Sequence, residues 1–163
     1  MKGVLVREIR KKDFKAFKIL YAQTIQNEFP EYSPNIRKYF ISEFKQDVLT
    51  SYIKIGAFNN EKLVGYILAG KKPYGGILNI DWLVVMKTYQ RRGIGQLLLE
   101  EIDKSGTDLG AHAIHLEVSH KNIPFYTLCG YKEYGFDEKG YFGTDNYLMK
   151  KELGEPDEKH FLG

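Results

Sequence analysis

The part of the chain that most clearly indicates chemistry is a basic segment that contains two glycines. Residues 90–96 read Gln-Arg-Arg-Gly-Ile-Gly-Gln and lead into an apolar pattern with helical spacing. The first N–H groups of a helix have no partner within it, and the helix dipole is positive there. Gly93 and Gly95 let an anionic group approach the backbone, and Arg91 and Arg92 add positive charge beside it. The segment therefore predicts a phosphate-binding helix N-terminus.

Two other glycine-rich nucleotide sites are excluded by the residues that follow these glycines. A dinucleotide-binding fingerprint needs a third glycine, but Leu98 stands at that position. A P-loop needs a lysine and then Ser or Thr after its last glycine, but Gln96 and Leu97 stand there. The same residues also suit a helix that merely begins at glycines beside two solvated arginines, so the interpretation depends on the rest of the sequence.

The histidines and the single cysteine indicate neither a metal site nor a nucleophile. His112 and His115 are three residues apart in a predicted strand, which places them on opposite faces. No group of His, Cys and carboxylate residues has the spacing of a zinc site, so we predict no metal. Cys129 is the one cysteine of the chain, and we expect it to be a packed thiol near a helix end. No Gly-x-Ser-x-Gly motif indicates a serine hydrolase.

The elements that must position the basic segment form a mixed α/β pattern around one sheet. Apolar runs and alternation predict strands, and apolar residues spaced by three or four predict helices. Ser33 followed by Pro34 is a clear helix start, and Asp13 is a plausible N-cap for the first helix. We expect strands at residues 4–9, 52–58, 63–69, 77–86, 113–119, 131–136 and 146–151, and helices at 14–27, 34–49, 93–109 and 122–130.

Length and composition place the chain among folded domains of ordinary size. Of its 163 residues, 43% are hydrophobic and 28% are charged, and the formal net charge is +3. We expect a single domain over residues 1–153 and a loose polar tail over 154–163. The longest uncharged apolar stretch, residues 63–70, is too short to span a membrane, and charged residues begin too early for a signal peptide. The lone cysteine suits the reducing cytoplasm, and the modest charge suits a small anionic ligand rather than nucleic acid.

In this context the basic segment resembles the Gln/Arg-x-x-Gly-x-Gly/Ala motif of the GCN5-related N-acetyltransferases, the GNAT superfamily. The resemblance implies an α/β fold with a single mixed, mostly antiparallel sheet of about six or seven strands and about four flanking helices. Further residues follow the family order: Ile9-Arg10 and Asp13 before the first helix, Ile80 to Val85 in the strand before the motif, then Leu116-Glu117-Val118, Asn122, Phe125-Tyr126, Gly130-Tyr131 and the closing strand 146–151.

The resemblance also implies how acetyl-CoA binds as a co-substrate. Backbone groups of Leu83, Val84 and Val85 would pair with the pantetheine arm as if it were an added strand. An N–H near Val85 would polarise the thioester carbonyl. The pyrophosphate would lie against the backbone of the motif, and two downstream side chains would complete the contacts. The expected cofactor-binding residues are therefore Leu83, Val84, Val85, Arg91, Arg92, Gly93, Ile94, Gly95, Gln96, Asn122 and Tyr126.

Tyr126 matches the tyrosine that many GNAT members use to protonate the leaving CoA thiolate. A thiol pKa near ~8.5 and a phenol pKa near ~10 make that transfer nearly balanced. The other interpretation is that Phe125 and Tyr126 are a core aromatic pair. The stretch from Val118 to Tyr126 is shorter than in most family members and contains Pro124, so the orientation of Tyr126 and the contact of Asn122 are open.

Two carboxylates match positions of a base. An alkyl ammonium has a pKa near ~10.4 and must lose a proton before it can attack a thioester. Glu117 matches the base position of the ribosomal-protein N-terminal acetyltransferase branch of the family. Asp81, which shares a strand face with Asn79, matches an acidic position of other branches. Either acid could instead be only a hydrogen-bond acceptor, and the sequence does not decide between them.

The resemblance implies acetyl transfer from acetyl-CoA to a primary amine by direct attack in a ternary complex. The amine could belong to a protein N-terminus, a lysine or a small molecule. The acceptor would lie near residues 28–33 and the last hairpin, with Glu138, Tyr141, Phe142 and Asp145, because acids and aromatic rings suit a cation. The alternative is a CoA-binding sensor or interaction module of the same fold without turnover. A monomer and a homodimer are both compatible with the sequence.

Overall fold

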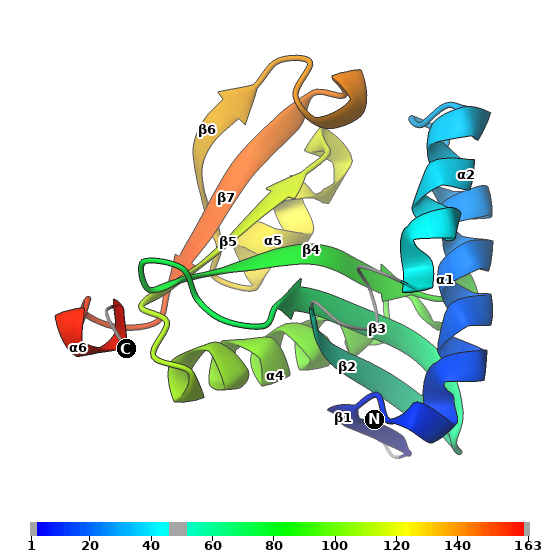
Figure 1. The fold of residues 1–163 in the computed structure, drawn as a ribbon, viewed down its shortest axis with the longest axis horizontal. Coiled ribbons are helices and arrows are strands. Elements are labelled where there is room, and N and C mark those ends of the chain that lie inside the picture. Colours follow the sequence, from blue (N-terminus) through cyan, green and yellow to red (C-terminus); the bar gives the residue numbers. More distant parts are fainter. Residues whose placement is uncertain (1–2, 46–51, 162–163) are drawn as a thin grey trace. The chain divides into compact units, whose positions relative to one another are not determined.

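The computed structural model describes residues 3–45 and 52–161, and Figure 1 shows their helices and strands. The strands follow the hydrogen-bonding order β1-β2-β3-β4-β5-β7-β6 in one seven-stranded sheet. β4 and β5 pair in parallel, whereas β1–β2, β5–β7 and β6–β7 are antiparallel. The predicted mixed, mostly antiparallel sheet is therefore confirmed. The strands are β1 Val4–Glu8, β2 Tyr52–Asn59, β3 Lys62–Gly70, β4 Ile77–Val85, β5 Ala113–Val118, β6 Lys132–Asp137 and β7 Asn146–Glu152.

Among the described residues, four helices begin at or one residue after their predicted starts, and a further one lies in the segment expected to be a loose tail. They are α1 Phe14–Glu28, α2 Pro34–Ser42, α4 Ile94–Asp108, α5 Ile123–Leu128 and the single turn α6 Glu158–Phe161. Short 3₁₀ turns lie at Lys11–Asp13, Glu43–Lys45, Lys87–Tyr89, His120–Asn122 and Tyr141–Gly143. Among residues 3–45 and 52–161, no helix is long and apolar enough to cross a membrane.

The chain divides into two compact units, which are described separately below. Unit 1 comprises Met1–Leu68 and Trp82–Leu98, and unit 2 comprises Ala69–Asp81 and Leu99–Gly163. Unit 1 therefore contains the first two helices and the basic segment, including the start of α4. Unit 2 contains β5, β6, β7, α5 and the rest of α4.

The core of unit 1 is built from aromatic rings of α1 and the strands. Phe17 and Tyr66 are fully buried, and their ring centroids lie 5.0 Å apart in an edge-to-face arrangement. Phe44 joins them at 5.2 Å from Phe17. Such edge-to-face pairs contribute about 0.5–1.5 kcal/mol each beyond the area that they bury. In Figure 1, α1 and α2 run side by side, and the hydroxyl of Tyr21 donates to the carbonyl of Phe40 at 3.2 Å.

The second helix begins where the sequence predicts and ends earlier. The hydroxyl of Ser33 accepts from the N–H of Ile36 at 3.3 Å, which confirms the N-cap. The prediction that this helix continues to Leu49 is wrong, because α2 ends at Ser42 and a 3₁₀ turn follows. The hydroxyl of Ser42 donates to the carbonyl of Tyr39 at 2.7 Å and so competes with the helical pattern. The expected last residues, 46–49, lie outside the described part.

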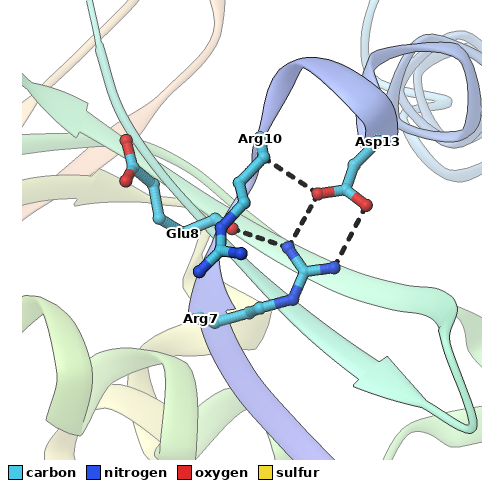
Figure 2. A network of polar contacts seen from close by, with 4 residues as sticks. All are labelled: Arg7, Glu8, Arg10 and Asp13. Carbon is cyan, nitrogen blue, oxygen red and sulfur yellow. Dashed lines mark hydrogen bonds and ion pairs between the residues drawn. The ribbon is translucent and has the colours of Figure 1, made fainter.

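Asp13 is the N-cap residue of α1, as predicted, but its side chain makes no capping hydrogen bond and instead joins β1 to α1 (Figure 2). Its carboxylate accepts hydrogen bonds from both Nη atoms of Arg7, at 2.7 and 3.1 Å, and from the backbone N–H of Arg10 at 2.9 Å. The guanidinium of Arg7 lies 3.7 Å above the ring of Phe58. A bidentate Arg–carboxylate pair is stronger than a single cap bond, which explains why the side chain turns toward β1.

Unit 2 packs α4 against its part of the sheet through a glycine inside the helix. A Cβ at Gly106 would lie 3.1 Å from Leu153 and 3.3 Å from Leu78, so the helix approaches closely only because this residue is glycine. Asp103 of α4 forms an ion pair with Lys151 and accepts from the hydroxyl of Tyr131 at 3.4 Å. Gly110, with φ of +79°, ends the helix as predicted.

The residues after β7 pack against other residues of unit 2. The N–H groups of Leu153 and Gly154 both donate to the carbonyl of His112, at 2.7 and 3.3 Å. The ring of Phe161, in α6, lies 5.5 Å from that of His112. The segment that the sequence suggests as a loose tail thus includes a helical turn with an aromatic contact. His112 itself precedes β5 and is not part of the strand.

Candidate functional site

In unit 1 the basic segment forms a turn whose backbone is left-handed at two positions. Arg91 has φ of +58° and Gly93 has φ of +78°, and α4 begins at the next residue, Ile94. Among the residues that the structure describes, none lies within 4 Å of a Cβ built at Gly93, so these residues leave the space beside this backbone open. The N–H of Leu97 donates to the carbonyl of Gly93, which fixes Gly93 as the N-cap. Left-handed residues before a helix N-terminus gather N–H groups into a concave anion site.

Gln90 fixes this turn to the end of β4. Its Nε2 donates to the carbonyl of Val85 at 2.9 Å and to Oε2 of Glu28 at 3.3 Å. The guanidinium of Arg92 lies 5.5 Å from the centre of the Tyr89 ring. The first residue of the motif is therefore a structural link, and the two glycines shape the space where the anion is expected.

The last residues of β4 present backbone groups beyond the end of its pairing with β5. The N–H of Met86 donates to the carbonyl of Val64 in β3 at 2.9 Å. In an antiparallel pair, alternate residues point their N–H and C=O at the partner, so Leu83 and Val85 point theirs away from β3. The β4–β5 register ends at Ile80, so these groups lie beyond it. The carbonyl of Val85 accepts from Gln90, so the groups expected to pair with an extended ligand at this edge are those of Leu83 and the N–H of Val85.

A glycine of β3 that the sequence reasoning did not single out holds this part of β4 in place. A Cβ at Gly65 would lie 2.8 Å from the carbonyl oxygen of Val84 and 3.4 Å from Leu98 of α4. Real side chains do not approach a backbone oxygen so closely, so only glycine fits. An isolated glycine within a predicted strand was the available signal, because it often marks a close backbone approach.

In unit 2 the two candidate acids lie on one exposed face of neighbouring strands. Asn79 of β4 pairs with His115 of β5, and the next pair, Ile80 with Leu116, is the last one between these strands. Side chains alternate along a strand, so Asp81 shares the face of Asn79, and Glu117 shares the face of His115. The residues between them, such as Leu116, are buried on the opposite face. The structure thus brings both acids and His115 to one surface.

Burial, together with neighbouring charges, shifts the pKa values of two groups on this face toward each other. Burial raises the pKa of Glu117, and the nearby Asp137 raises it further. Burial lowers the pKa of His115, and Lys150 and His112 act in the same direction. The hydroxyl of Tyr134 lies 3.2 Å from Nδ1 of His115, and the two rings are 5.1 Å apart. Sequence reasoning tested His115 only as a metal ligand and missed it here, although its spacing of two from Glu117 places both on one strand face.

Tyr126 is buried in unit 2 among other aromatic rings. Its ring centroid lies 5.0 Å from Phe125 and 5.7 Å from Tyr131, and only 8% of the residue is exposed. Burial raises the pKa of its hydroxyl, with a smaller contribution from Cys129. The hydroxyl is therefore protonated at neutral pH.

Asn122 directly precedes α5, and its side chain makes no capping hydrogen bond to that helix. It adopts a helical backbone conformation, and its Nδ2 donates to Oγ of Ser119 at 3.4 Å. α5 is only six residues long, shorter than the expected span of 122–130, and Pro124 lies in its first turn. Cys129 follows the helix as a half-buried free thiol whose pKa is raised by burial.

The expected residues therefore fall into two groups. Unit 1 holds the backbone groups expected to bind the cofactor, and unit 2 holds the side chains expected to move protons. The first group is Leu83, Val84, Val85, Arg91, Arg92, Gly93, Ile94, Gly95 and Gln96, and the second is Asp81, Glu117, Asn122 and Tyr126.

Comparison with known proteins identifies the family. The sequence model of the acetyltransferase (GNAT) family matches residues 8–131, which is most of the chain. The match includes the end of β4, the glycine turn and Tyr126. The chain therefore belongs to the GNAT acetyltransferase family.

Individual relatives are distant in sequence and similar in fold. The uncharacterized N-acetyltransferase YjcF of Bacillus subtilis is 25% identical over 87 residues, which cover 48% of this chain and 62% of that protein. The chain thus spans less than two thirds of that relative. The PaiA N-acetyltransferase of Thermoplasma acidophilum in complex with coenzyme A has a TM-score of 0.77 at 21% identity, over 92% of this chain and 99% of that one. The ribosomal-protein-S18-alanine N-acetyltransferase of Escherichia coli has a TM-score of 0.71 at 21% identity, over 95% and 97%.

Proposed function

We propose that the chain transfers an acetyl group from acetyl-CoA to a primary amine by direct attack in a ternary complex. Membership of the GNAT acetyltransferase family supports the reaction class. The solved PaiA structure, which shares the fold, contains coenzyme A. The acceptor is proposed as a primary amine of a protein N-terminus, a lysine or a small molecule.

The observation that carries the proposal is the pair of backbone features in unit 1. β4 continues past the end of its pairing with β5 and offers the N–H groups of Leu83 and Val85. The left-handed turn at Arg91 and Gly93 then leads directly into α4. A strand edge suits an amide-containing arm, and a helix N-terminus suits a pyrophosphate. Acetyl-CoA carries both groups at opposite ends of one molecule.

The proton-handling roles are proposed for three side chains of unit 2. Tyr126, protonated at neutral pH, gives its proton to the CoA thiolate as the tetrahedral adduct collapses. Glu117 or Asp81 takes a proton from the ammonium or holds the water that does so. The raised pKa of Glu117 supports Glu117 for this role, because it makes the carboxylate a better base.

The test is release of free CoA thiol from acetyl-CoA, measured with and without amines. The panel contains a peptide with a free N-terminus, an N-terminally blocked peptide with one lysine, and a linear polyamine. Release that depends on one of these amines, together with its acetylated product, supports the proposal. Tight acetyl-CoA binding with no release for any amine would favour the sensor without turnover.

A further inference from the structure

A histidine–tyrosine pair lies on the same face as the candidate acids, and the sequence-based assignment does not use it. We propose that Nε2 of His115, with its ring held by Tyr134, is the group beside Glu117 that finally receives the proton lost by the attacking amine. This inference rests on the proposed function, because it assigns a further catalytic residue to that reaction. Tyr134 acts through His115 and is a positioning residue.

The register of unit 2 places His115 next to the candidate acids. His115 and Glu117 are two residues apart on one face of β5, which separates their Cα atoms by roughly 6.5 Å. Asn79 of β4 pairs with His115 of β5, and Asp81 lies two residues after Asn79 on the same face of β4. A proton on Glu117 therefore has a neighbouring acceptor on its own strand face.

The bond to Tyr134 depends on an irregularity in β6. Glu133 pairs with Met149 and Gly135 with Leu148, so Tyr134 is an extra residue at a bulge. A bulge re-aims a side chain, and here the ring reaches across β7 to His115. The hydroxyl lies 3.2 Å from Nδ1, with the ring centroids 5.1 Å apart. Since Tyr134 occupies Nδ1, only Nε2 remains for a proton from the substrate side.

Nε2 can accept a proton only in one of the two neutral tautomers. The hydrogen of the ring must lie on Nδ1 and be donated to the Tyr134 oxygen, which leaves a lone pair on Nε2. The opposite tautomer, in which Tyr134 donates to Nδ1, has Nε2–H and cannot serve as the acceptor. The proposal therefore commits His115 to the Nδ1–H tautomer.

The charges around His115 suit a neutral ring that can take up a proton. Burial, Lys150 and His112 lower the pKa of His115, so the ring is neutral near pH 7. The raised pKa of Glu117 brings the two groups closer in basicity, and a proton passes between groups of similar basicity at little cost. The groups around His115 are Glu117 on its own strand, Asn79 and Asp81 on β4, Lys150 on β7, Tyr134 on β6, and His112 just before β5.

The protons balance over the whole reaction. The ammonium gives one proton to Glu117, and Glu117 passes it to His115. The imidazolium that forms then releases the proton to water. The freed nitrogen lone pair forms the N–C bond to the thioester carbonyl. As the C–S bond breaks, the CoA sulfur takes the proton of Tyr126 and ends as a thiol, and the second proton from the nitrogen restores the hydroxyl of Tyr126. One ammonium and one thioester thus give one amide, one thiol and one proton in solution.

The first test does not depend on activity. Nitrogen-15 NMR of the imidazole ring, assigned by comparison with His115→Asn, reports the tautomer of His115 directly. We expect a protonated Nδ1 and a lone pair on Nε2 at neutral pH in the wild type, and a mixture of tautomers in Tyr134→Phe. A wild-type ring protonated on Nε2 would overturn the proposal.

The second test is the pH dependence of amine acetylation. Asn places its amide nitrogen near the position of Nδ1, so His115→Asn keeps the bond to Tyr134 but cannot take the proton. We expect kcat to fall roughly 100-fold with an unchanged KM for acetyl-CoA. The wild-type rate should rise with pH through an ionisation below the ordinary histidine value of 6.5 and then level off, and this ionisation should be absent from the variant.

The control is His160→Asn, which changes a histidine of α6. Its Nδ1 also faces a partner, because it lies 3.6 Å from the carboxylate of Asp157. This variant should keep the wild-type rate and pH profile. A His115→Asn enzyme with wild-type kcat and profile would overturn the role of His115 and leave the acetyltransferase proposal standing. A wild type that binds acetyl-CoA but acetylates no amine would overturn the proposed function and with it this role.

Discussion

Gly95 is the residue at which a single substitution should remove the cofactor while leaving the fold intact. A glutamate there places bulk and negative charge in the first turn of α4, where the pyrophosphate is expected. We predict that Gly95→Glu weakens CoA binding by roughly 100-fold or more, equivalent to about 2.7 kcal/mol. Isothermal titration with CoA measures the loss.

The matched control is Gly154→Glu, because a Cβ at Gly154 meets nothing within 4 Å. This variant carries the same added charge and should bind CoA as the wild type does. Wild-type affinity in Gly95→Glu would show that the cofactor binds elsewhere.

Tyr126 separates the catalytic interpretation from the core interpretation. Its ring packs against Phe125 and Tyr131, and phenylalanine preserves those contacts. We predict that Tyr126→Phe lowers kcat roughly 100-fold and leaves the Kd for acetyl-CoA unchanged, because only the proton donor is lost. Steady-state kinetics with titration of acetyl-CoA measures both. An unchanged kcat would leave Tyr126 as a core aromatic residue.

At the scale of elements, the approach of β3 to β4 depends on Gly65. A Cβ there would lie 2.8 Å from the carbonyl oxygen of Val84, which belongs to the backbone and can move only with its strand. We predict that Gly65→Ala destabilises the fold by about 1–3 kcal/mol and also weakens acetyl-CoA binding, because β4 must shift. Urea unfolding with and without acetyl-CoA measures both effects.

Gly70→Ala is the control within the same strand, since its Cβ would lie an ordinary 3.9 Å from the carbonyl of Lys72. It should differ little from the wild type in both measurements. Equal stability of the two alanine variants would contradict the close approach of β3 to β4.

The joint between β1 and α1 should give a pH-dependent contribution to stability. The bond from Arg7 lowers the pKa of Asp13 to about 2, below its ordinary 3.8, so ionised Asp13 stabilises the folded state above that ordinary value. The contribution is lost as the pH falls through about 2. Because the pair is partly exposed, we predict that Asp13→Asn costs roughly 1–2 kcal/mol at pH 7. Unfolding curves from pH 7 to pH 2 should show the two proteins converging, and equal stability at pH 7 would contradict the contribution.

These element boundaries also show what periodicity could predict. The strands and the starts of α1, α2, α4 and α5 followed from apolar spacing, with Ser33 at the start of α2 and Gly110 after the end of α4, as their chemistry requires. Asp13 and Ser42 departed from expectation because each found a stronger local partner: Arg7 for Asp13 and the Tyr39 carbonyl for Ser42. Such competition between partners depends on three-dimensional contacts that local propensity does not include.

The candidate site shows the same limit. The glycine turn could be predicted because it is contiguous in the chain and its geometry follows from residue type. The pairing of His115 with Tyr134 could not, because it depends on a bulge in β6 that shifts the register by one residue. The close approach at Gly65 likewise joins two strands that are separate in sequence.

At the scale of the whole molecule, the residues with proposed roles are divided between the two units. Unit 1 holds the backbone groups proposed to bind the cofactor, and unit 2 holds the side chains proposed to move protons. The family assignment supports acetyl transfer as the reaction class, and the solved structures share the fold. Binding of acetyl-CoA is the property on which every further step depends.

The most direct test is thermal unfolding of the purified protein, shown to be free of bound CoA, with and without saturating acetyl-CoA. A ligand at about 100 times its Kd stabilises the folded state by roughly 2.7 kcal/mol. For a chain of this size, that predicts a rise in Tm of roughly 5–10 °C, and a smaller rise with adenosine alone. An unchanged Tm in the folded protein would contradict the acetyl-CoA site. The protein would then share the fold of its family without the proposed acetyl-CoA binding.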